Sequence, residues 1–226
     1  MKIVANSNIS SDNVSFEETL TFLFDIQEVE SPNSFRKSDL ICDNDEDYKI
    51  IINLFENCDS FAANYSDEQL AAGYRYIIDP GESDLIFCTI GENVNHIVTL
   101  RMLNSMLKVF QEIFDKRCKS CLLNNNYQEN NYLLNKLCFL WWDIVPIQGV
   151  YSDNEIEKEI NRNLFDLLST ILQMKNISCI ESAMHGFGLL FHQNPKSVSK
   201  IMNENKAYIP SLLSSYYEEI LAGDVI

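Results

Sequence analysis

Residues that break helices are scarce in this chain, which has seven glycines and five prolines among 226 residues. No segment between turn signals alternates apolar and polar residues as a half-buried strand would. Apolar residues instead recur at helical spacings of three and four almost everywhere. The scarcity of breakers and the missing strand pattern together predict an all-α protein.

Basic residues are also scarce, because 17 Lys and Arg stand against 33 Asp and Glu, for a formal net charge of −16. Such a charge repels phosphate backbones and therefore disfavours direct nucleic-acid binding. A hydrophobic fraction of 46% excludes a disordered chain, since that many apolar side chains need a core. The composition indicates a folded protein whose partner is basic.

Export and membrane signals are missing as well. The opening residues, 1–8, turn polar too early to form the apolar centre of a signal peptide. The best apolar run, Leu137–Trp142, is too short to span a bilayer. Seven scattered cysteines, an odd number, indicate reduced thiols rather than a disulfide framework. We therefore expect a cytoplasmic protein that does not contact membranes.

Helix starts are marked by three capping boxes, which begin at Ser15, Ser66 and Ser152. The longest apolar pattern covers 98–114 and has two adjacent stripes, so this helix should have neighbours on more than one side. A short helix should follow Pro195, and Pro210 should lie in the first turn of the last helix. The other helices are predicted over about 16–29, 48–57, 67–78, 129–144, 152–171 and 177–191.

We interpret residues 1–226 as a single all-helical domain. Its N-terminal part, 1–90, contains acidic helices, and residues 91–226 form a stack of helix pairs. From about residue 93 onward the pairs recur every 35–45 residues, roughly the length of a two-helix solenoid repeat. The repeats share spacing rather than sequence.

Two segments resemble a known group of proteins. Residues 138–146 read Cys-Phe-Leu-Trp-Trp-Asp-Ile-Val-Pro, and residues 179–188 read Cys-Ile-Glu-Ser-Ala-Met-His-Gly-Phe-Gly. They are similar to a Trp-Trp-Asp-Ile segment and a Glu-Ser-Ala-Leu-His-Gly-Leu-Gly-His run of uncharacterised bacterial proteins with HEAT-like repeats. The resemblance implies an irregular HEAT-like or armadillo-like stack of antiparallel helix pairs, without an established activity. Leu189 stands where that family often has a second histidine, which counts against chemistry that needs both.

Glu181 and His185 lie one helical turn apart, and His192 lies two turns further along the same face. The two histidines are about 10 Å apart at the helical rise, too far to share a zinc ion. We therefore predict neither a metal nor a cofactor here. Glu181 could orient His185 for proton transfer. The favoured interpretation is structural: both side chains buttress neighbouring helices, while Gly186 and Gly188 allow close backbone approach.

The Trp141–Trp142 pair is predicted to lie in the core, with Asp143 accepting a hydrogen bond from an indole or the backbone. The alternative for this pair is a ligand-stacking platform or an exposed hot spot. Cys118 and Cys121 form a lone CxxC that lacks a second pair for zinc. We interpret these two cysteines as incidental thiols at a helix end.

The acidic excess is strongest over residues 1–60 and peaks at 39–47. It can be a solvated face that keeps the protein soluble, or a surface complementary to a cationic partner. A calcium loop is not expected, because the glycine and terminal glutamate of an EF-hand are missing. The candidate partner-binding residues are Asp43, Asp45, Glu46, Asp47, Glu82 and Asp84.

These features favour a non-catalytic binding protein. We expect an immunity protein that binds a cognate basic toxin domain one to one, as in bacterial contact-dependent inhibition. It would occlude the active site of a nuclease-type toxin by placing carboxylates where phosphates would lie. A helical-repeat adaptor for a peptide or protein is the alternative. An enzyme that uses Glu181, His185 and Asp143 is the third hypothesis, although no catalytic constellation is recognisable in the sequence.

Overall fold

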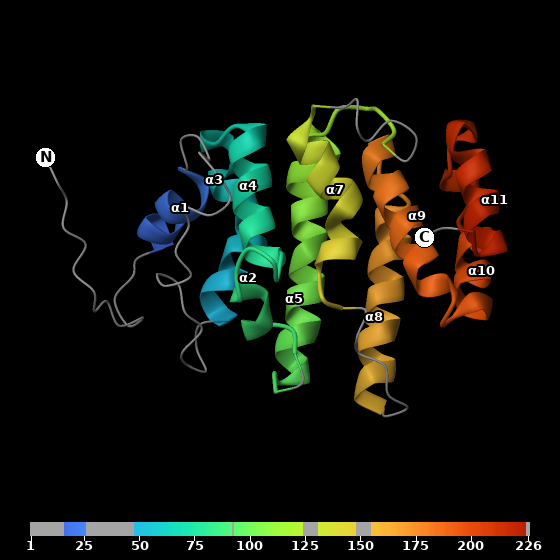
Figure 1. Cartoon of the computed structure of the whole chain (residues 1–226), viewed down its shortest axis with the longest axis horizontal. Coiled ribbons are helices and arrows are strands. Elements are labelled where there is room, and N and C mark those ends of the chain that lie inside the picture. The colour runs from blue at the N-terminus through green and yellow to red at the C-terminus, as the bar shows by residue number, and fades with distance from the viewer. Residues whose placement is uncertain (1–15, 26–47, 92, 124–130, 148–154, 225–226) are drawn as a thin grey trace, which may run out of the picture.

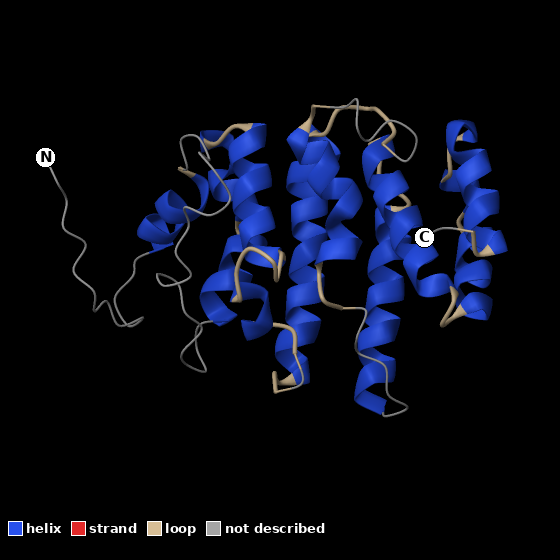
Figure 2. Cartoon of the chain, viewed as in Figure 1, coloured by secondary structure: helices blue, strands red, loops and turns tan. Residues whose placement is uncertain are grey.

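The regular structure of this protein is helical throughout the part that the computed structural model describes, which comprises residues 16–25, 48–91, 93–123, 131–147 and 155–224 (Figures 1 and 2). No strand occurs among these residues, so the all-α prediction is confirmed. The α-helices are α1 (Phe16–Phe24), α2 (Tyr48–Glu56), α3 (Cys58–Phe61), α4 (Asp67–Ile78), α5 (His96–Val109), α6 (Asp115–Arg117), α7 (Leu133–Ile144), α8 (Glu155–Ile171), α9 (Ile177–Phe191), α10 (Pro195–Glu204) and α11 (Ser214–Ala222).

The helices pack in two adjacent rows (Figure 1). In the α7 row, α1, α4, α7, α9 and α11 follow one another, and each contacts the next. In the α5 row, α5 lies between α2 and α8. Contacts between α8 and α9 join the rows, and a π-helical turn, Phe110–Phe114, continues α5 and contacts α7 and α9. The central helix therefore has neighbours on several sides, as its two apolar stripes predict.

The centre of the core is an aromatic cluster around Trp141, which is fully buried. Its indole packs edge-on or tilted against the rings of Phe55, Tyr74, Phe110 and Phe114, with ring centroids 5.3–6.4 Å away. Trp142 is 4% exposed and stacks on Phe110. Both tryptophans are thus core residues, which confirms the structural interpretation of this pair.

The observed helix boundaries match the boundaries predicted from the sequence in part. Ser66 forms the predicted capping box with Gln69, whereas Ser15 and Ser152 lie outside the described residues. The α7 helix begins at Leu133, four residues after the predicted start. Pro210 does not open α11, because the 3-10 turn Ser211–Leu213 comes first and α11 begins only at Ser214.

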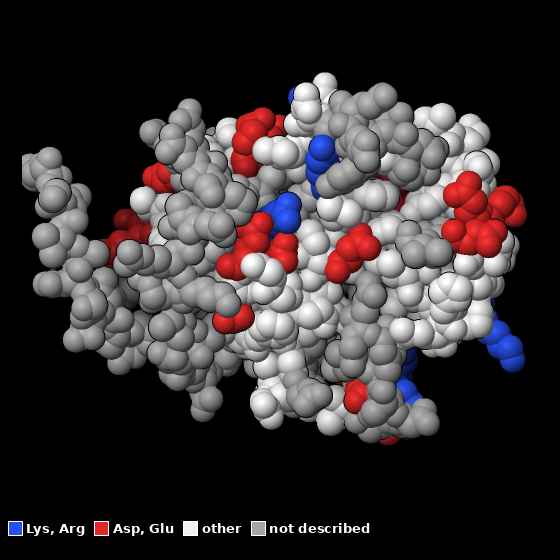
Figure 3. Space-filling view, in the orientation of Figure 1, with Lys and Arg blue, Asp and Glu red and all other residues white. Residues whose placement is uncertain are grey.

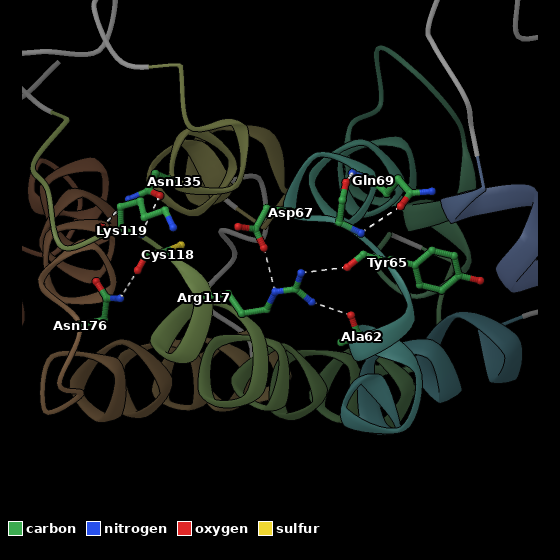
Figure 4. A network of polar contacts seen from close by, with 10 residues as sticks. Ala62, Tyr65, Asp67, Gln69, Arg117, Cys118, Lys119, Asn135 and Asn176 are labelled. Atoms are coloured by element: carbon green, nitrogen blue, oxygen red, sulfur yellow. Dashed lines mark hydrogen bonds and ion pairs between the residues drawn. The ribbon is translucent and has the colours of Figure 1, made fainter.

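Arg117 ties the end of the central helix to the turn before α4 (Figure 4). Its Nε donates to Asp67 Oδ1 at 2.8 Å, and its two terminal nitrogens donate to the carbonyl oxygens of Ala62 and Tyr65. The planar, five-donor guanidinium group suits such a fork of acceptors. The interaction joins residues about fifty positions apart, so helical spacing could not reveal it.

The cysteines differ from the sequence expectation at one position. Cys88 is disulfide-bonded, so the expectation of reduced thiols is wrong for this residue. The other described cysteines are not in disulfide bonds. Within the described residues, no helix is both long and apolar enough to cross a membrane.

Cys58 predicts a loss of stability at alkaline pH. Burial raises the pKa of this thiol to about 12, and the Asp59 carboxylate adds to the shift. An exposed thiol in the unfolded chain ionises at a pKa of about 8.5. The stabilisation from the neutral thiol is therefore complete below about pH 8.5 and is lost as the pH rises toward 12.

We expect this thiol alone to lower the free energy of unfolding by about 1.4 kcal/mol per pH unit between those two pKa values. Urea unfolding at a series of pH values measures the slope. Cys58→Ala should show a correspondingly shallower fall, whatever its stability at neutral pH. Identical slopes in the two proteins would contradict the expectation.

Candidate functional site

Three side chains from three successive helices of the α7 row form one hydrogen-bonded chain, called here the Asp143 relay. Asp143 lies in the last turn of α7, His185 in the middle of α9 and Tyr216 in α11. His185 Nε2 lies 2.8 Å from Asp143 Oδ2, and His185 Nδ1 lies 2.8 Å from the Tyr216 hydroxyl. The relay links α7, α9 and α11 through polar contacts.

The relay runs from the protein interior to its surface. Tyr216 is 6% exposed, and the side chain of His185 is 8% exposed, whereas that of Asp143 is 36% exposed. The Phe139 ring stacks on the imidazole with its centroid 4.6 Å away. Phe139 precedes Asp143 by four residues, so both lie on one face of α7. Of the three relay groups, the Asp143 carboxylate is the one that reaches solvent.

Electrostatics keep the phenol of the relay neutral. Burial raises the pKa of Tyr216, and the carboxylates of Glu181, Asp143 and Glu219 raise it further. A neutral phenol can donate to Nδ1, which leaves Nε2 to donate its proton to Asp143. A phenolate nucleophile is disfavoured by the same negative surroundings.

Glu181 does not take part in the relay. It is fully buried, and its two carboxylate oxygens accept from the backbone N–H of Leu123 at 3.0 and 2.9 Å. The interpretation of Glu181 as the group that orients His185 is therefore wrong, because Asp143 and Tyr216 occupy both ring nitrogens. Glu181 instead fastens α9 to the segment that follows the central helix.

The glycine after His185 has the role expected from the sequence. A Cβ atom on Gly186 would lie 2.9 Å from Leu168 Cδ2 and 3.0 Å from the Trp142 ring. This close approach lets α9 pack against both α8 and α7. Gly188 is also buried in α9. Asp143 departs from its expected role, since its partner is His185 rather than an indole or the backbone.

Two amide side chains hold the CxxC loop in place (Figure 4). Asn135 donates to the carbonyl oxygen of Lys119 and accepts from its N–H, and Asn176 donates to the carbonyl oxygen of Cys118. Cys118 is buried and Cys121 half-buried. The loop is thus built into the junction between the central helix, α7 and α9.

The acidic candidates fall into two groups. Asp43, Asp45, Glu46 and Asp47 lie outside the described residues. Glu82 and Asp84 are both exposed in the loop after α4. Glu82 pairs with Arg75 Nε at 2.9 Å, so its charge is partly neutralised.

Two carboxylates beside α5 are neutralised within the protein. Glu56 forms a two-bond ion pair with Arg101, and Asp59 pairs with Lys108. These pairs lie along α2, α3 and α5, where Glu56, Arg101 and Lys108 also line an open groove of about 480 Å³. The groove therefore offers little net charge to a ligand.

Two carboxylates of the α7 row are different. Among the described residues, neither Asp143 nor Glu219 forms an ion pair with a lysine or arginine; Glu219 accepts from the Ser215 hydroxyl instead. Figure 3 shows carboxylates at several separate places on the face that carries α7 and α9, with few basic side chains between them. Asp143 and Glu219 therefore retain uncompensated negative charge.

Comparisons with known proteins add no family. Neither a protein-family model, nor a curated protein, nor a solved structure matches this chain. The geometry and the charge distribution are therefore the basis for assigning a function.

Proposed function

We propose that this protein is a non-catalytic acidic binding protein, most specifically an immunity protein that neutralises a basic, nuclease-type toxin domain. The observation that carries the proposal is the uneven neutralisation of its charge. Glu56 and Asp59 beside α5 are paired internally, whereas Asp143 and Glu219 on the α7 row lack a described lysine or arginine partner. With a net charge of −16, these two uncompensated carboxylates suit a cationic protein surface.

We further infer that the two rows form an irregular HEAT-like stack. Successive helices alternate between the rows as α5 and α7, then α8 and α9, and each helix contacts its neighbours along its own row. The resemblance of residues 138–146 and 179–188 to HEAT-like proteins supports the same arrangement. Such a stack offers a long, rigid surface on which carboxylates can be spaced to match a partner.

The inhibition would be steric and electrostatic. A nuclease cleft is basic because it binds phosphates, so a surface of carboxylates can occupy it. Long-range attraction would speed the encounter in the cytoplasm, where the toxin would otherwise act. The complex would be one to one, and no covalent step is needed.

Cell protection tests the proposal directly. The probe is the C-terminal domain of the protein encoded immediately upstream, expressed in cells with and without this chain. Protected cells and a stable one-to-one complex are the expected results. Survival that does not depend on this chain, or a complex with a non-toxic partner only, would reject the immunity function and favour an adaptor.

The acidic segment at 43–47 should govern the association rate. Neutralising Asp43, Asp45, Glu46 and Asp47 together should slow association with that domain about tenfold and flatten its salt dependence. A matched variant neutralises four exposed acids elsewhere, namely Glu155, Glu159, Asp166 and Glu204. Equal rates for the two variants in stopped-flow measurements would place the interface away from 43–47.

A further inference from the structure

The Asp143 carboxylate is held far more firmly than a surface acid needs to be. His185 fixes Oδ2, and Tyr216 fixes His185, at 2.8 Å in each case. Both supporting groups are buried and so lose their contact with water. The two hydrogen bonds offset the free energy that this desolvation costs. An exposed carboxylate is stable in water without such support. The arrangement therefore determines where the unbound oxygen of Asp143 points.

The surroundings of this oxygen favour a cation. Glu181 and Glu219 are close enough to raise the pKa of Tyr216 together with Asp143, so the local field is negative. The half-buried Phe139 ring lies beside His185 on the same face of α7 as Asp143. A guanidinium or ammonium group bound to the carboxylate could also rest against this ring.

We infer that Asp143 is a preorganised binding site for an arginine or lysine side chain of the partner, with the relay as its support. The inference rests on the proposed function and assigns it a specific contact. Preorganisation matters because a carboxylate that is already oriented loses little side-chain entropy on binding. Oδ1 is free of described hydrogen bonds, so it can accept directly from the incoming cation.

A purely structural relay makes a different prediction. Asparagine at position 143 can still accept the His185 N–H through its amide oxygen and so can hold α7 to α9, but it carries no charge. If the relay only holds the helices together, Asp143→Asn should change neither stability nor binding. If Asp143 binds a cation, the same substitution removes the charge that binds it. Asp166→Asn is the matched control, since Asp166 is also an exposed aspartate, lies on α8 away from the relay, and gives the same change in net charge.

The test uses the full chain and a fluorescently labelled hexa-arginine peptide, with the uncharged hexa-citrulline peptide as its counterpart. We expect Asp143→Asn to weaken hexa-arginine binding about fivefold or more and Asp166→Asn to weaken it less than about twofold. Tyr216→Phe, which keeps the carboxylate but removes its support, should give an intermediate loss. The His185 ring signals in NMR spectra should shift on peptide addition in the unaltered chain.

Equal losses for Asp143→Asn and Asp166→Asn, or unchanged His185 signals, would overturn the inference. So would equal binding of the citrulline peptide. If Asp143→Asn lowers the midpoint of thermal unfolding, its weaker peptide binding can reflect a disturbed fold. In that case the binding of Tyr216→Phe and the His185 signals of the unaltered chain test whether Asp143 binds the cation. Peptide binding at Asp143 without protection from the toxin domain would refute the proposed function alone. This inference alone would be refuted if Asp143→Asn still protected cells and lost no more peptide binding than the control variant.

Discussion

Replacing Glu181 with alanine should destabilise the protein by about 3–5 kcal/mol. The carboxylate is fully buried and accepts from the Leu123 N–H with both oxygens. Alanine would remove these charge-assisted bonds, leave a buried N–H without this acceptor and open a cavity in α9. Urea-induced unfolding, followed by circular dichroism, measures the loss.

Glu181→Gln is the control for this prediction, because its amide oxygen can still accept from Leu123 while its volume is unchanged. We expect a smaller loss, of about 1–2 kcal/mol. A loss below about 1 kcal/mol for the alanine variant would show that the buried carboxylate contributes little. The hydrogen-bonded ring N–H signal of His185 should persist in Glu181→Gln, because Asp143 and Tyr216, not Glu181, hold the imidazole.

Gly73→Ala should have the second large effect, by separating α1 from α4. A Cβ atom at this position would lie 2.2 Å from Phe24 Cδ1 and 2.7 Å from the backbone oxygen of Leu23. The oxygen belongs to the backbone, so a side-chain rotation cannot relieve this clash. Phe24, fully buried against Phe61, Tyr65 and Tyr74, would be forced out of the core.

We expect Gly73→Ala to cost about 2–4 kcal/mol, which combines overpacking with the lost burial of Phe24. Gly91→Ala is the matched control, since a Cβ atom there would meet its nearest neighbours at 3.7 and 3.8 Å. That variant should stay within about 0.5 kcal/mol of the unaltered chain. Chemical denaturation of both proteins provides the comparison, and equal stabilities would contradict the tight contact.

Local patterns predicted the elements of this fold well. The apolar spacing located the central helix and α9, the capping box located the start of α4, and the Trp141–Trp142 pair was correctly expected in the core. These features depend on neighbours within a few turns of one helix. Periodicity reports such neighbours directly.

The Asp143 relay could not be predicted in the same way. His185 lies 42 residues from Asp143 and 31 residues from Tyr216 along the chain. Within one helix, spacing of four residues made Glu181 the apparent partner of His185. The partners come instead from the adjacent helices of the α7 row, and their choice depends on how α7, α9 and α11 rotate against one another. Single-sequence periodicity does not specify those rotations.

The most direct test of the central claim is a calorimetric titration of this protein with the C-terminal domain encoded immediately upstream. We predict tight one-to-one binding that weakens as salt is added, because the uncompensated carboxylates supply much of the attraction. The same titration with Asp143→Asn measures the contribution of the relay to that complex. An absence of heat at all salt concentrations, or binding that salt does not weaken, would contradict the account.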